Sequence, residues 1–102
     1  MAGFVRVADA AEIGDNDLAA FEVGGERIAV ANVGGMFHAF DDTCTHLQCS
    51  LAEGELEGTV VTCPCHGSQF DVTTGEVRRG PAQRPVRSYS TRVDDNALQV
   101  DI

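Results

Sequence analysis

The sequence predicts an all-β fold, and three observations support this prediction. Pairs of glycines separate apolar stretches in the first half of the chain, and apolar and polar residues alternate near its end. No stretch carries the apolar stripe, repeating every three to four residues, that is typical of a buried helix face. The chain has 102 residues, which is the length of one domain, and we expect a single domain over 1–102.

The first half predicts a meander of short strands. Gly24-Gly25 and Gly34-Gly35 fit two-residue hairpin turns, because glycine readily adopts the positive φ angles that such turns need. Between 8 and 18 we expect one helical turn at most, since Gly14, Asp15 and Asn16 interrupt it. The expected strands are Phe4–Val7, Leu18–Val23, Glu26–Val33 and Met36–Phe40.

The last part of the chain predicts two further strands. Residues 87–93 alternate in character, and so do residues 98–102 after a turn at 94–96. This period of two is expected of strands with one buried face.

The middle of the chain differs in composition from both ends. Residues 41–85 contain all four cysteines, two of the three histidines and all three prolines. Strand-like residues occur there only in short pieces, at 59–62 and 69–72. We therefore expect residues 1–40 and 86–102 to form a basal β scaffold, with 41–85 as a loop-rich binding segment inserted between them.

The charge excludes some classes of partner. The chain has 16 acidic and 7 basic residues, with a formal net charge of −9. Nucleic acids and anionic membranes need a basic surface, so we expect neither as a partner. The chain also lacks an apolar run long enough for a membrane span or a signal peptide, and we expect a cytoplasmic protein.

The charges are unevenly distributed along the chain. Five arginines lie in a window without carboxylates, at 78, 79, 84, 87 and 92, whereas 41–62 holds five acidic residues and no cation. These charges either pair across the fold or form a docking surface with an acidic side, where charge steers encounter.

Two short stretches combine cysteine with histidine. They are Cys44-Thr45-His46 and Cys63-Pro64-Cys65-His66, with 16 residues between His46 and Cys63. If the two cysteines bind one metal and the two histidines a second, each loop braces both metals, as in a binuclear iron–sulfur centre. A single zinc held by two cysteines and two histidines uses the same ligands. The spacing favours iron–sulfur, because zinc usually takes its cysteines from one knuckle and its histidines from another.

Written out in full, Cys44-Thr45-His46-Leu47-Gln48-Cys49 and Cys63-Pro64-Cys65-His66-Gly67-Ser68 resemble the Rieske family of 2Fe-2S proteins. The resemblance implies an antiparallel β-sandwich or barrel with a small inserted cluster-binding subdomain. It implies one Rieske-type 2Fe-2S cluster, with Cys44 and Cys63 on one iron and His46 and His66 on the other. It also places Pro81 in a loop over the cluster.

The resemblance suggests roles for residues near the cluster. Cys49 and Cys65 match a cysteine pair that forms a disulfide in some members. Leu47 would shield the cluster from water, and the hydroxyl of Ser68 would donate to a cluster sulfur and raise the potential. Phe70 stands where high-potential members carry a tyrosine donor, so we expect an intermediate potential.

Three other residues are less informative. Gln48 replaces a glycine common in the family, with no predictable effect. His38 matches no motif, and we expect a structural role for it. Asp71 either accepts hydrogen bonds from loop amides or lies in solvent.

The resemblance implies a soluble one-electron carrier with no catalysis of its own. Such a monomeric ferredoxin would pass electrons from a flavin-dependent ferredoxin reductase to a terminal oxygenase of the aromatic-ring-hydroxylating type, by transient docking. One alternative is a Rieske subunit of a stable multi-subunit oxidoreductase, similar to the small subunit of nitrite reductase. A second is a zinc-binding interaction module.

Overall fold

Eleven strands and two short 3-10 helices make up the described part of the chain, which covers residues 3–45 and 49–102 of a computed structural model. The strands are β1 (Phe4–Asp9), β2 (Leu18–Val23), β3 (Glu26–Val33), β4 (Met36–Asp41), β5 (Glu55–Glu57), β6 (Val60–Thr62), β7 (Gln69–Asp71), β8 (Val77–Arg79), β9 (Ser88–Tyr89), β10 (Thr91–Asp94) and β11 (Ala97–Asp101). The 3-10 helices are η1 (Ala10–Glu12) and η2 (Leu51–Glu53).

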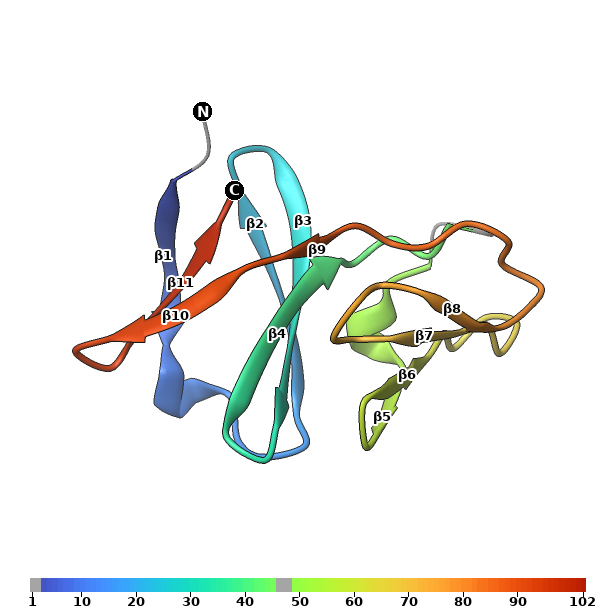
Figure 1. Cartoon of the computed structure of the whole chain (residues 1–102), viewed down its shortest axis with the longest axis horizontal. Coiled ribbons are helices and arrows are strands. Elements are labelled where there is room, and N and C mark those ends of the chain that lie inside the picture. Colours follow the sequence, from blue (N-terminus) through green and yellow to red (C-terminus); the bar gives the residue numbers. More distant parts are fainter. Residues whose placement is uncertain (1–2, 46–48) are drawn as a thin grey trace.

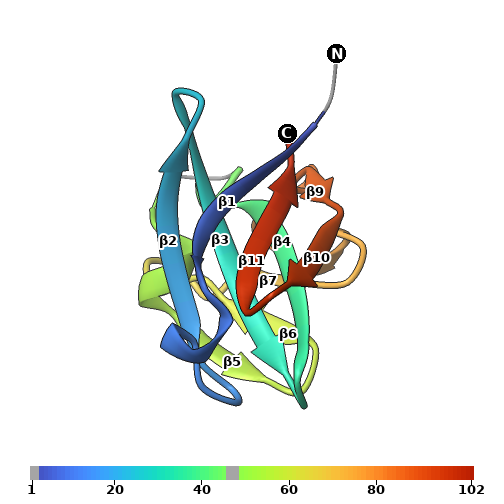
Figure 2. The ribbon, with the colours of Figure 1, turned by 90° about the vertical axis from the view of Figure 1, so that its left-hand side faces the viewer.

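The strands form three antiparallel sheets, with the orders β1-β11-β10, β2-β3-β4-β9 and β5-β6-β7-β8. The sheet β2-β3-β4-β9 lies between the other two (Figure 1). Viewed from the left-hand side of Figure 1, the molecule presents β1, β11 and β10 in front of this middle sheet (Figure 2). The sheet β5–β8 therefore lies at one end of the molecule, built entirely from the cysteine-rich part of the sequence.

Strand β3 of the middle sheet packs against the layers on both of its faces. Its apolar run is buried on both faces, and successive side chains of a strand point to opposite sides. Ile28 and Val30 pack in one core with Leu98 and Val100 of β11. Ala29 and Ala31 face the other way.

The second core lies between the middle sheet and the cysteine-rich segment. The small side chains of β3 leave room there for larger ones, and this core includes two of the four cysteines. Its buried residues are Ala29, Ala31, Phe40, Cys44, Leu51, Leu56, Val61, Cys63, Phe70, Val72, Ala82 and Val86. Residues on both cysteine-containing loops are thus anchored in the same apolar core.

The all-β prediction is confirmed, and β2 and β3 have the expected bounds. The glycine pairs at 24–25 and 34–35 have the positive φ angles that the hairpin turns need. The expected single turn before β2 is η1.

Two expectations about the strands were wrong. Residues 87–93 do not form one strand, because β9 pairs with β4 in the middle sheet and β10 pairs with β11 in another. In the middle segment the expected short strands are present as β6 and β7, but two others were not expected. The unpredicted strands β5 and β8 flank β6 and β7 and complete a four-stranded sheet.

Among the residues that the structure describes, none belongs to a helix with the length and apolar character needed to cross a membrane.

Candidate metal centre

Two loops carry the cysteine–histidine motifs, and both close in the same way. Residues 43–50 connect β4 to η2, and residues 63–68 connect β6 to β7. The backbone N–H of Cys44 donates to the carbonyl of Cys49 (2.9 Å), and that of Cys63 donates to the carbonyl of Ser68 (2.7 Å). Each loop therefore returns to its starting cysteine after five residues.

The structure brings Cys44 and Cys63 together. Both are free cysteines, with exposed fractions of 1% and 3%. Both also belong to one buried core. Burial raises the pKa of Cys63 and the thiol of Cys44 raises it further, although backbone N–H groups of Cys65 and His66 donate to its sulfur and partly oppose the rise. A metal ion would supply the positive charge that a thiolate needs at this buried position.

The two expected histidine ligands differ in what the structure shows. His66 is exposed, and its backbone N–H is one of the donors to the Cys63 sulfur. His46, together with Leu47 and Gln48, lies outside the described residues.

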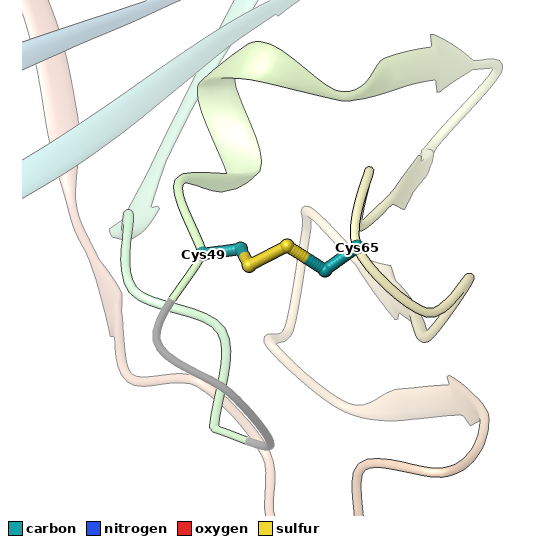
Figure 3. Close-up of a disulfide and its surroundings, with 2 residues drawn as sticks. All are labelled: Cys49 and Cys65. Carbon is teal, nitrogen blue, oxygen red and sulfur yellow. A yellow bond between two sulfur atoms is a disulfide. The ribbon is translucent and has the colours of Figure 1, made fainter.

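A disulfide joins Cys49 to Cys65 and so links the two loops (Figure 3). The expected pairing is therefore present in the structure. The sulfur atoms of Cys49, Cys63 and Cys65 all lie within 4.8 Å of one another. Since two of these sulfurs are bonded to each other, Cys63 is the one of the three that remains available to a metal.

Asp42 fixes the base of the first loop, a role that the sequence did not suggest. Its carboxylate is 1% exposed and accepts hydrogen bonds from Arg27 Nε (2.7 Å) and from the backbone N–H of Ala52 (2.8 Å). Its carbonyl accepts from the N–H of Leu51 (2.7 Å). One residue thus holds both ends of the loop that carries Cys44 and Cys49.

A third loop, residues 80–85 after β8, packs against both cysteine-containing loops. The N–H of Ala82 donates to Ser68 Oγ (3.0 Å), and Thr45 Oγ1 donates to the carbonyl of Arg84 (2.7 Å). Pro81 is exposed in this loop. Ser68 is fully buried and accepts from Ala82, so its own hydroxyl hydrogen stays available to a second partner.

Phe70 and Asp71 support the site from β7. Phe70 is fully buried in the second core. Asp71 accepts hydrogen bonds from the N–H and Oγ1 of Thr73 and from Arg78. Burial alone would raise the pKa of Asp71, but the bonds from Arg78 and Thr73 outweigh it and lower that pKa below its ordinary value. Asp71 therefore accepts loop hydrogen bonds and is not a solvent residue.

The surface beside the second loop is open to solvent. A hollow of about 400 Å³ borders the second loop, lined in part by Glu53, Glu55 and Cys63. His38, on β4, lies apart from the cysteines, in a hollow shared with Thr73 and Tyr89.

Comparison with known proteins identifies the family to which this chain belongs. The sequence profile of the Rieske [2Fe-2S] domain matches residues 3–90. The chain belongs to the Rieske [2Fe-2S] domain family. As a Rieske domain it takes a 2Fe-2S cluster as its cofactor, and the two buried free thiols on facing loops fit that group.

Relatives of this Rieske domain include ferredoxins of oxygenase systems. It is 36% identical over 97 residues to the ferredoxin component of biphenyl 2,3-dioxygenase from Rhodococcus jostii (strain RHA1), covering 95% of this chain and 91% of the relative. The ferredoxin of carbazole 1,9a-dioxygenase from Nocardioides aromaticivorans IC177 has a similar structure, with a TM-score of 0.92, 31% identity and 95% coverage of both chains.

A further similar structure includes a partner. It is described as a complex of reduced oxygenase and oxidized ferredoxin in carbazole 1,9a-dioxygenase. Its TM-score is 0.90 at 34% identity, covering 96% of this chain and 92% of the other.

Proposed function

We propose that this Rieske domain is a soluble one-electron carrier that serves a terminal oxygenase of the aromatic-ring-hydroxylating type. The main support for the proposal is that Cys44 and Cys63, two buried free cysteines on different loops, pack in the same core. The relatives' description as ferredoxin components of dioxygenase systems supports the choice of a carrier over an enzyme.

Four residues would hold the cluster. Cys44 and Cys63 would bind one iron, and His46 and His66 the other. When bound, the cluster would hold a single electron, at a reduction potential raised by its neutral imidazole ligands. The exposure of His66 supports this assignment, because an edge of the cluster near solvent is where an electron can pass to a partner.

The surrounding residues would set the potential. The buried hydroxyl of Ser68, already held by Ala82, would donate its hydrogen to a cluster sulfur and stabilise the more negative reduced state. Phe70 offers no second donor at its position. The potential should therefore lie inside the family range of roughly −150 to +300 mV and away from both ends.

The partners would be a flavin-dependent ferredoxin reductase and the oxygenase, each bound transiently. A carrier must leave one partner before it meets the other, which favours small interfaces and weak binding. The oxygenase complex of a similar ferredoxin supports the second partner. We further propose that the protein is a monomer and cytoplasmic, and that it keeps the disulfide between Cys49 and Cys65.

A redox titration of the purified protein tests the proposal. We expect a coloured protein that takes up one electron and then gives a rhombic EPR signal. A colourless protein with bound zinc would refute the proposal in favour of the interaction module.

Sedimentation tests the remaining alternative. We expect a monomer that binds its reductase with micromolar or weaker affinity. A stable complex with a large subunit would instead indicate a Rieske subunit of a multi-subunit oxidoreductase.

A further inference from the structure

The segment 79–85 is an exposed strip beside the candidate metal centre. It begins at Arg79, which pairs with Gln69 at the end of the second cysteine-containing loop. It then contacts Ser68 through Ala82 and Thr45 through the carbonyl of Arg84. Within it only Ala82 is buried, so the other side chains face solvent next to both loops.

The arginines of this strip differ from the others in the chain. Arg6, Arg27, Arg78 and Arg87 each form an ion pair with a carboxylate, and Arg92 contacts Gln99 and Phe4. Within residues 3–45 and 49–102, neither Arg79 nor Arg84 has an ion pair. The segment 79–85 itself contains no carboxylate.

Among the described residues, this contrast divides the arginines of the chain into paired and unpaired ones. Much of the charge does pair across the fold, since Arg78 binds Asp71 and Arg87 lies near Asp41 and Glu26. The segment that carries Arg79 and Arg84, the two arginines whose side chains have neither an ion pair, a hydrogen bond nor a ring contact among the described residues, lies beside the metal centre. In a chain of net charge −9, it is a local positive strip on a repulsive background.

We propose that Arg79 and Arg84 form a docking strip for carboxylates on the surface of a redox partner protein. This inference rests on the proposed function as an electron carrier. An acidic patch on the partner is repelled by most of this chain and attracted only at the strip. The strip thus selects the orientation in which the partner meets the metal centre, and it acts mainly on the rate of productive encounter.

The test uses small inorganic oxidants as charged probes of the surface at the centre. The reduced holoprotein is mixed in stopped flow with ferricyanide, an anion, or with a trivalent cobalt amine complex, a cation. Two double variants are compared: R79E/R84E, and R6E/R92E as a control with the same change in net charge. Arg6 and Arg92 lie on β1 and β10, at the opposite end of the molecule from β8 (Figure 1).

For the unaltered protein we expect ferricyanide oxidation to slow as salt is added, as for attracted charges. For charges about 10 Å apart in water at about 0.1 M salt, R79E/R84E should lower the ferricyanide rate about ten-fold. The same variant should speed oxidation by the cobalt complex. The control should change either rate less than about two-fold, because its charges lie at the opposite end of the molecule and are screened by salt over that separation.

The two probes together separate docking from a change in potential. An altered potential would move both rates in the same direction, whereas a local charge moves them in opposite directions. If ferricyanide oxidation of the unaltered protein speeds up with salt, or if both double variants react alike, the inference is wrong while the carrier function stands. A protein without a reducible cluster would overturn the proposed function and this inference with it.

Discussion

Gly75 is the point at which the turn between β7 and β8 meets the chain returning to the middle sheet, and its replacement by alanine should be costly. Gly75 has a φ of +84° and is buried, and its carbonyl accepts the N–H of Val86 (2.9 Å). A Cβ at this position would overlap the backbone carbonyl oxygen of Val86. The turn would have to move away from Val86, which is itself buried.

Two contributions make up the cost of Gly75→Ala. Placing an L-residue at this positive φ costs about 1–2 kcal/mol. Separating the chains at Val86 leaves a buried backbone N–H unpaired, which adds about 1–3 kcal/mol. The total is about 2–5 kcal/mol, a large part of the stability of a domain of this size.

Gly25 supplies a matched control for this variant. It has the same φ of +84°, but a Cβ there would meet no atom within 4 Å. Gly25→Ala should therefore show only the conformational cost of about 1–2 kcal/mol. Urea unfolding of the unaltered protein, Gly75→Ala and Gly25→Ala, followed by far-UV circular dichroism, measures the destabilisation caused by each substitution. Equal destabilisation by the two substitutions would refute the reasoning, because the close approach to Val86 would then cost nothing.

Three further predictions follow from individual contacts. The disulfide spans a sequence separation of 16 residues, so replacing Cys49 and Cys65 by serine should lower the free energy of unfolding by about 3 kcal/mol, and an unchanged urea midpoint would contradict this. Burial and a hydrogen bond to Asp41 raise the pKa of Tyr89, the single tyrosine, to about 12. The tyrosinate absorbance should thus titrate near pH 12, with stability lost as the pH rises from 10 to 12, and a folded-state midpoint at 10 would refute it. The pKa of Asp71 is lowered on folding, so its stabilising effect is complete above the ordinary carboxyl pKa and is lost as the pH falls through the folded value. The difference in urea midpoint between the unaltered protein and Asp71→Asn should be largest at neutral pH and shrink below about pH 4, and a difference independent of pH would contradict this.

Much of the basal scaffold could be predicted because its signals are local. The glycine pairs at 24–25 and 34–35 mark hairpin turns by a backbone requirement that few other residues satisfy. Alternation at 98–102 marks β11, whose buried Leu98 and Val100 face one core. These signals need no knowledge of the rest of the chain.

The strands of the cysteine-rich segment were harder to predict because they are short and charged. Glu55 and Glu57 surround a single buried Leu56 in β5, and β8 carries two exposed arginines. Such segments become strands only because β6 and β7 offer edges to pair with. Their pairing is a tertiary effect that local propensity does not contain.

The site likewise has features that the sequence predicts and one that depends on the tertiary fold. The ligand motifs could be recognised from spacing and residue type, but the role of Asp42 could not. In the sequence it is one acid among several, and acidic residues are rarely buried without partners. Only the fold brings Arg27 and the N–H of Ala52 to its carboxylate.

The central claim is that two cysteines and two histidines hold a one-electron cluster. The most direct measurement is EPR of the reduced protein labelled with ¹⁵N-histidine, on the unaltered chain and on His38→Gln. We predict a rhombic signal integrating to one electron per chain, with nitrogen couplings from two histidines, unchanged by the substitution of His38. The absence of a signal after reduction, or a signal without histidine nitrogen couplings, would contradict the account.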